Sequence, residues 1–205
     1  PDAAVLKIGK GNMPEKRAIV HLPHKILHQE ALAVAPDEIQ SPKIRRLISD
    51  MKKTLAGSPD GVGLAAPQIG VGLRIFLVSS EAEQLDANTP TGAGFVGPTG
   101  QARIGINDTD GKREWEYHAF INPVLKKQAR KKTEMAEGCL SLPGKYGKVA
   151  RAEKVFLEWL DDHGRKHGRG FTKFFARVIQ HEMDHLDGLL ISDRAKKLVV
   201  ITHNR

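Results

Sequence analysis

The feature that most restricts how this chain can fold is an apolar segment near its end that carries two histidines. Residues 172–186 are predicted to form a helix that is ended by Gly188. Its large apolar side chains include Phe174, Phe175, Val178, Ile179 and Leu186. His181 and His185 are four residues apart and therefore lie on one face of this helix. Because buried imidazoles without partners are costly, the rest of the chain must fold so that it supplies partners for them.

Two histidines with this spacing can hold a single metal ion. Glu182 follows the first histidine and is placed to reach a water molecule beside the metal without being a ligand, which is the arrangement of HExxH hydrolases. A polar helix face that binds no metal is the alternative for the motif taken alone. The apolar character of the helix favours the metal site.

A third metal ligand is needed, because a catalytic site of this type has three protein ligands and one open position. Metalloproteases take it from downstream of the motif, but the chain after Glu182 contains no Glu. It offers only four other candidates, at none of the spacings that those proteases use: Asp184, Asp187, Asp193 and His203. The third ligand is therefore expected upstream.

Cys139 is the best upstream candidate, since a thiolate is a strong ligand for a borderline-soft divalent ion and the flanking Gly138 allows a close approach. A lone cysteine can also be a small core residue or a nucleophile. The HExxH motif argues against the nucleophile, because a thiol hydrolase has no use for two stacked histidines with a glutamate between them.

The rest of the chain predicts strands and one further helix. Ser41 and Pro42 open a helix that Gly57 closes, with an apolar stripe of Ile44, Leu47, Ile48, Met51 and Leu55. Strands are expected at 74–79, 118–125 and 155–160, the last followed by a hairpin turn at 161–164. Residues 60–70 indicate a glycine-rich loop. Residues 81–116 indicate a long loop or loosely ordered surface insertion.

These elements favour one domain over residues 1–205 of the α+β class. We expect mostly antiparallel sheets around the central helix that bears the HExxH motif. A domain boundary at 81–116 is the alternative, but the segments on either side carry complementary parts of one site, as the motifs below indicate.

The composition indicates a protein of the cytoplasm. No apolar run approaches the roughly 18 residues that a membrane helix needs, so no membrane association is expected. The first residues lack the pattern of a secretory signal. The single cysteine excludes an internal disulfide and suits a reducing compartment. An organelle, after removal of a transit peptide, is the alternative.

The formal net charge of +8 raises the question of a polyanionic partner. Lys and Arg are spread along the chain, with short clusters at 126–132 and 194–197, and aromatic residues make up 5% of it. Nothing resembles a platform for stacking bases, so no specific nucleic-acid site is predicted. A solvated basic surface is favoured over a patch that contacts a nucleic-acid-rich partner such as the ribosome.

Three segments stand in order along the chain: residues 61–68 (GVGLAAPQ), 137–141 (EGCLS) and 180–185 (QHEMDH). Together they resemble the three signature motifs of peptide deformylases, GxGLAAxQ, EGCLS and QHExDH. The resemblance spans residues 39–193 and is interrupted by the segment 81–116, which is longer than many members of that family need.

The resemblance implies a role for each matching residue. Cys139, His181 and His185 would be the metal ligands and Glu182 the general acid and base. The Gln68 side chain and the Leu140 backbone N–H would donate hydrogen bonds to the oxygen of a formyl group. The substrate backbone would approach at Gly63, and the neighbouring residues Glu137 and Gly138 are added to the expected substrate-binding set.

The resemblance also implies an activity. A peptide deformylase is a metal-dependent hydrolase that removes the formyl group from N-formyl-methionyl N-termini of newly made polypeptides and releases formate. One divalent ion per chain is implied, with Fe²⁺ as the expected native metal and Zn²⁺, Ni²⁺ or Co²⁺ as substitutes. A metallopeptidase is disfavoured by the missing downstream ligand. The remaining alternative is an inactive or altered-substrate relative that binds metal.

The methionine side chain of such a substrate would enter an apolar pocket beside the metal helix. Val62, Met135, Phe174 and Val178 are the candidate lining residues, with ordinary core packing as the alternative for each. Arg177 lies one turn before His181 and is not an obvious pocket residue.

Overall fold

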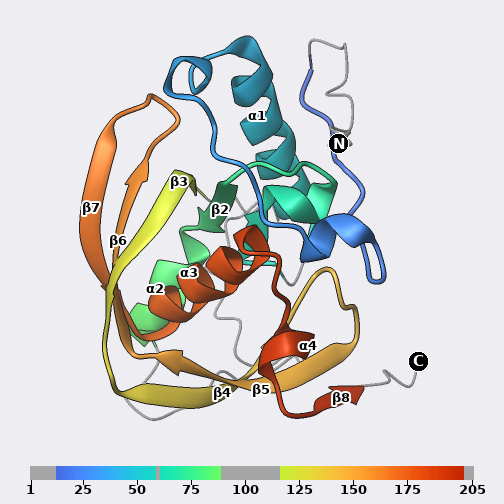
Figure 1. The fold of residues 1–205 in the computed structure, drawn as a ribbon, viewed down its shortest axis with the longest axis vertical. Coiled ribbons are helices and arrows are strands. Elements are labelled where there is room, and N and C mark those ends of the chain that lie inside the picture. Colours follow the sequence, from blue (N-terminus) through green and yellow to red (C-terminus); the bar gives the residue numbers. More distant parts are fainter. Residues whose placement is uncertain (1–12, 59–60, 89–115, 201–205) are drawn as a thin grey trace, which may run out of the picture.

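The computed structural model of the chain describes residues 13–58, 61–88 and 116–200. Its strands form two antiparallel sheets (Figure 1). The larger sheet contains β1 (Gly63–Ala65), β2 (Ile75–Ser79), β3 (Tyr117–Gln128), β6 (Lys154–Leu160) and β7 (Lys166–Thr172), in that order. The smaller sheet contains β4 (Lys132–Gly138), β5 (Lys145–Ala152) and β8 (Leu198–Val200). The α+β prediction with antiparallel sheets is confirmed.

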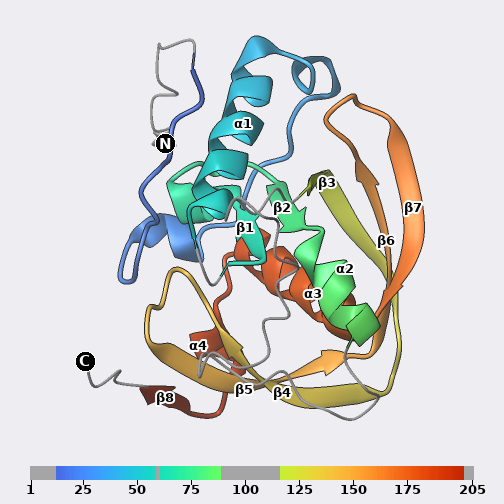
Figure 2. The same ribbon diagram turned by 180° about the vertical axis from the view of Figure 1, so that it is seen from behind.

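Helix α3 (Lys173–Leu186) packs against strands of both sheets (Figures 1 and 2). Its apolar side chains Phe175, Val178 and Ile179 join a buried cluster with Phe76 and Phe120 of the larger sheet. Gly188 follows the helix with a φ of 71°, the left-handed conformation that favours glycine. The predicted helix is therefore confirmed, and it holds its polar face between the two sheets.

Helix α1 (Pro42–Ala56) covers the other face of the larger sheet. The Ser41 hydroxyl accepts a hydrogen bond from the Ile44 N–H and caps its N-terminus, and Gly57 stands at its C-terminus. Its predicted apolar stripe is buried against Leu64 and the β2 residues Ile75 and Leu77. Because side chains alternate along a strand, β2 is buried on both faces, with its other side toward α3.

Shorter elements complete the described fold. A third apolar cluster joins Val149 of β5 to the 3₁₀ helix η1 (Lys25–His28) and the start of α4 (Ile191–Arg194). A second 3₁₀ helix, η2 (Pro36–Glu38), precedes α1. Within the described residues, no helix is both long and apolar enough to cross a membrane.

Two predictions of loop structure were wrong in part. The segment expected as a glycine-rich loop forms the edge strand β1 and the 3₁₀ helix η3 (Ala66–Ile69), because its apolar residues pair with β2 and become buried. The expected insertion begins as helix α2 (Glu81–Asn88), which packs against α3 and fully buries Ala82. Residues 89–115 of that insertion lie outside the described part of the chain.

Candidate metal centre

Two segments that are far apart in the sequence bring three metal-binding side chains together. Cys139 directly follows β4, whereas His181 and His185 lie one turn apart on α3. One ligand atom from each of the three residues lies within 4.8 Å of the others. Cys139 Sγ is 3.2 Å from His185 Nε2. One thiolate and two imidazoles are a donor set that suits a borderline-soft divalent ion.

The electrostatics of this cluster favour the thiolate, which is the form of cysteine that binds metals. Burial opposes ionisation of Cys139, but the neighbouring His185 and His181 outweigh it and hold the pKa of the thiol well below its usual range. Burial likewise opposes protonation of His181, but Cys139 and Glu137 raise its pKa well above the usual range. Metal binding would thus release a proton from an imidazole.

Glu137 stands behind the first histidine and fixes its ring. His181 Nδ1 lies 3.0 Å from Glu137 Oε2, which leaves Nε2 as the ring nitrogen free for a metal. Burial raises the pKa of Glu137, but bonds from His181 and Arg151 outweigh burial and lower it, so the carboxylate stays ionised. The structure thus places the Glu137 carboxylate behind a ligand and bonds it inside the protein, and its expected contact with substrate stays a prediction.

Glu182 is the buried carboxylate beside the ligand cluster. Its side chain is 3% exposed, and its Oε2 has no hydrogen-bond partner among the described residues. Burial raises the pKa of Glu182 to about 7. A carboxyl group with a pKa near neutrality can both accept and return a proton, as general acid–base catalysis requires.

Gly63 of β1 lies directly against Glu182. A Cβ atom at this position would stand 2.3 Å from Glu182 Oε1, so a side chain would displace the carboxylate. The glycine therefore serves the close approach of strand and glutamate.

Gln68 points its amide nitrogen at the ligand cluster. Its Oε1 accepts a hydrogen bond of 2.8 Å from the Ala65 N–H, and because that group can only donate, the orientation of the amide is fixed. Nε2 then lies 3.4 Å from Ser141 Oγ and 3.6 Å from Cys139 Sγ. Leu140 follows Cys139, with its side chain packed toward the α1 cluster. The first and second motifs therefore meet at one place.

Comparison with known proteins agrees with this arrangement. The family model described as polypeptide deformylase matches residues 16–200. The chain belongs to this family. Peptide deformylase 1A, chloroplastic/mitochondrial, of Arabidopsis thaliana is 36% identical over 186 residues, which are 88% of this chain and 64% of that protein. Peptide deformylase of Rhizorhabdus wittichii is 33% identical and covers 80% of this chain, which spans 78% of it.

A solved structure extends the comparison to the fold. The class I type b peptide deformylase from Acinetobacter baumannii, bound to Met-Ala-Ser, superposes with a TM-score of 0.69 at 28% identity, covering 89% of this chain and 99% of that one. The chain spans less than two thirds of the length of some curated relatives. It covers 64% of the Arabidopsis protein and 60% of peptide deformylase 3 from Streptomyces avermitilis. The predicted family resemblance is confirmed.

The residues predicted to line a methionine pocket differ in burial. Val178 is buried in the α3 cluster, and Val62 and Phe174 pack partly exposed against it. Met135 is half-buried on β4, opposite Val149. The ring of Tyr146 occupies the space where a side chain at Gly138 would stand.

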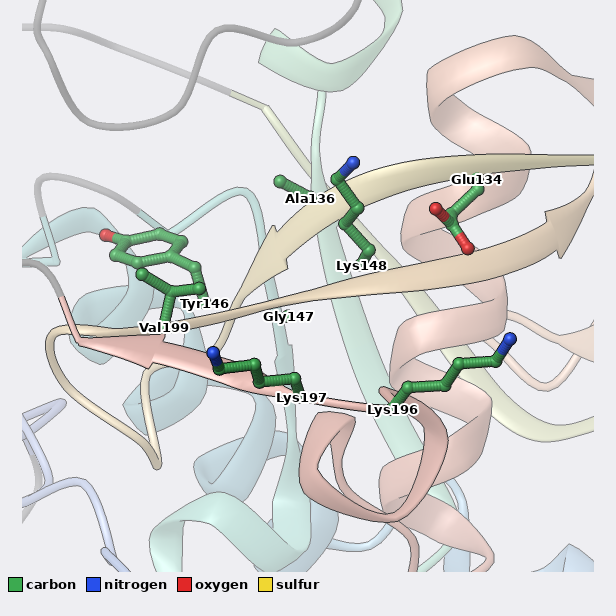
Figure 3. A pocket seen from close by; sticks show the side chains of 8 residues that line it. All are labelled: Glu134, Ala136, Tyr146, Gly147, Lys148, Lys196, Lys197 and Val199. Atoms are coloured by element: carbon green, nitrogen blue, oxygen red, sulfur yellow. The ribbon is translucent and has the colours of Figure 1, made fainter.

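A pocket of about 430 Å³ lies on the other side of the smaller sheet (Figure 3). Its β4 lining residues Glu134 and Ala136 alternate with Glu137, whose carboxylate binds Arg177 of α3, so this side of β4 faces away from α3. None of the residues predicted to bind substrate lines it; they are Glu134, Ala136, Tyr146, Gly147, Lys148, Lys196, Lys197 and Val199. The expected pocket lining stays a prediction.

A buried ion network behind the ligand cluster was not predicted from the sequence. Arg151 of β5 joins Glu137 to Asp184 of α3, and Arg194 binds the same Asp184. Arg177 also binds Glu137. The sequence indicated only that charged residues are abundant around the second and third motifs. Such residues usually lie on a solvated surface, and their pairing with one another depends on the tertiary structure.

Proposed function

We propose that the chain is a metal-dependent peptide deformylase, which hydrolyses the formyl group of N-formyl-methionyl N-termini of newly made polypeptides and releases formate. The observation that carries the proposal is the convergence of the Cys139, His181 and His185 donor atoms beside the buried, unpartnered carboxylate of Glu182. All four residues lie within the range that the family model matches.

Cys139, His181 and His185 would hold one divalent ion, with Fe²⁺ as the native metal and Zn²⁺, Ni²⁺ or Co²⁺ as substitutes. Such an ion supplies Lewis acidity, which polarises a carbonyl oxygen and lowers the pKa of water. Glu137 keeps the His181 ring in the orientation that presents Nε2.

The groups around this centre have two roles, transfer of the proton and stabilisation of the negative charge on the formyl oxygen. Glu182 takes a proton from the attacking water and returns it to the departing amine, which leaves formate and a free N-terminus. Gln68 Nε2 and the Leu140 N–H donate to the negative charge that develops on the formyl oxygen; loss of one such donor typically costs about 10²–10³ in rate. Gly63 leaves room for the substrate backbone beside Glu182.

For the methionine side chain we propose an apolar setting formed by Val62, Met135, Phe174 and Val178, with Gly138 beside the ligand Cys139. The Acinetobacter baumannii relative was solved with Met-Ala-Ser bound. That peptide suggests formyl-Met-Ala-Ser as the substrate for a first test.

The test measures formate released from formyl-Met-Ala-Ser by protein purified without oxygen and loaded with metal. We expect catalytic release from this peptide and none of acetate from acetyl-Met-Ala-Ser, which adds a methyl group where the formyl hydrogen stands. Absence of formate release from fully loaded protein would refute the proposed activity. Equal turnover of both peptides would leave a hydrolase of different specificity.

Gly63→Ala is expected to lower kcat/KM on the order of 10²-fold, because the new methyl group must push the Glu182 carboxylate away from its position and small misplacements of a catalytic group are that costly. Formate release under first-order conditions measures the change. Gly72→Ala is the matched control, since a Cβ there meets nothing within 4 Å. Equal rates for the two variants would contradict the assigned contact.

Partners and compartment remain proposals as well. The substrate is a nascent peptide, and a contact of the basic surface with the ribosome would bring the enzyme to it. The relatives include a chloroplast and mitochondrial protein and bacterial ones. We propose the cytoplasm, with an organelle as the alternative that the plant relative supports.

A further inference from the structure

The carboxylate of Glu137 is shared among three hydrogen-bond partners, two of them arginines. Arg151 binds it through two hydrogen bonds, from Nε to Oε1 at 3.0 Å and from Nη2 to Oε2 at 2.9 Å. His181 Nδ1 reaches Oε2 at 3.0 Å, and Arg177 Nη1 reaches Oε1 at 2.6 Å. Both oxygens thus have two donors each, and the strength of the bond to His181 depends on how much charge the two arginines take up.

Arg177 is held rigidly in this position. It lies one turn before His181 on α3 and is 5% exposed. Its guanidinium also donates to the backbone carbonyls of Val149 on β5, at 2.9 Å, and Thr133 on β4. These bonds fix the cation between the metal helix and the smaller sheet.

The two arginines are not equivalent. Arg151 is divided between two carboxylates, because it also binds Asp184, and Asp184 is in turn bound by the half-exposed Arg194. Among the described residues, Glu137 is the carboxylate that Arg177 pairs with. Arg177 is therefore the cation whose charge acts on Glu137 alone.

The charge left on Glu137 determines the donor strength of His181. A carboxylate that accepts a strong bond from Nδ1 makes the imidazole a more negative ligand, which binds a cation more tightly. More negative ligands also reduce the Lewis acidity that a hydrolase needs, and Cys139 already contributes a thiolate. A second guanidinium on Glu137 weakens the bond from the carboxylate to His181, so it makes the imidazole a less negative ligand.

We propose that Arg177 is a positioning residue that acts through Glu137 and His181: by taking up part of the Glu137 charge, it limits the electron donation of His181 and preserves the Lewis acidity of the bound ion. This inference rests on the proposed metal-dependent function. It predicts that loss of the Arg177 charge makes the protein hold the metal more tightly and lowers kcat. A purely structural role of Arg177 predicts no such opposite changes.

The experiment uses the full chain loaded with Co²⁺ and the variants Arg177→Met, Arg177→Gln and Arg177→Lys. For the two neutral variants we expect metal loss to a chelator to slow, kcat to fall on the order of tenfold with a smaller change in KM, and the visible Co²⁺ spectrum to shift. Arg177→Lys, which keeps the charge, is expected to remain close to wild type in all three. Gln retains a donor for the backbone carbonyls and serves if the Met variant does not fold.

Arg194→Met is the matched control, because it removes a cation of the same network that contacts Asp184 and not Glu137. Its metal loss, spectrum and kcat are expected to change less than those of the neutral Arg177 variants, because Arg194 reaches Glu137 only through Asp184 and Arg151. Faster metal loss from the neutral Arg177 variants, or an unchanged kcat, would overturn the proposal and leave Arg177 as a structural brace. Metal loss and the spectrum do not depend on turnover, so they decide the role of Arg177 even if wild type releases no formate.

Discussion

Glu182→Gln is expected to lower kcat/KM for formyl-Met-Ala-Ser by about 10²–10⁴ while the metal content stays at one ion per chain. Glutamine has nearly the same size as glutamate but cannot take up a proton from water and return it to the amine, and a positioned general acid–base group contributes a factor of this size. The Glu182 side chain is not among the grouped metal ligands, so metal binding should be retained. Formate release and elemental analysis of the same preparation measure both quantities.

Asp162→Asn provides the control for loss of an acidic side chain, since Asp162 lies in an exposed turn and pairs with Lys52. It should leave the rate unchanged. A Glu182→Gln variant as fast as wild type would remove Glu182 from the proton transfer, whereas a variant without metal would show that the residue supports the ligands instead.

Cys139→Ser is expected to weaken metal binding by about 100-fold or more and to abolish activity at ordinary metal concentrations. A serine hydroxyl stays protonated near neutral pH, so the variant loses the anionic sulfur ligand that His181 and His185 hold ionised. Even residues behind the metal ligands typically change affinity 10–100-fold when substituted. Metal bound per chain after dialysis against a weak chelator measures the effect.

The single cysteine offers an internal check on this assignment. In wild-type protein, a thiol reagent should label Cys139 quickly after metal removal and slowly once metal has been restored. Full metal content in Cys139→Ser, or labelling that ignores the metal, would exclude Cys139 from the ligand set.

The sequence predicted those parts of the site that depend on local geometry. His181 and His185 were expected on one helix face because the spacing of four requires it, and the structure places their rings 5.0 Å apart at the centroids. Cys139 followed from the lack of a downstream ligand and from its motif. Its approach to α3 is a tertiary contact, which no local pattern predicts.

The residues that the sequence could not predict are charged residues that become buried. Strands β4 and β5 were missed because they are rich in lysine, glutamate, glycine and alanine, which are depleted in strands. Arg151 and Arg177 are each 5% exposed, although residues of this type are almost never buried without a partner. Burial becomes favourable only when Glu137 and Asp184 arrive from other elements to pair with them.

The role of Gly63 in the first motif also could not be predicted from the sequence. The number of glycines in this motif indicated a loop, because glycine is usually chosen for conformational freedom. Gly63 instead lies in a strand. A side chain does not fit there, because Glu182 occupies the space that a Cβ atom would need. The requirement for glycine at this position comes from Glu182, which is more than one hundred residues away in the sequence.

The unpartnered oxygen of Glu182 also carries a cost for the folded state. Burial raises the pKa of this carboxyl from 4.5 to about 7, and a group whose pKa is higher in the folded than in the unfolded chain favours folding only while it is protonated. For the metal-free protein, this contribution is fully present below about pH 4.5 and is lost as the pH rises through about 7. At the pH of most cells, the chain therefore gives up folding stability to keep this carboxylate buried, a trade between stability and activity in which the proposed general acid–base group is itself the destabilising one.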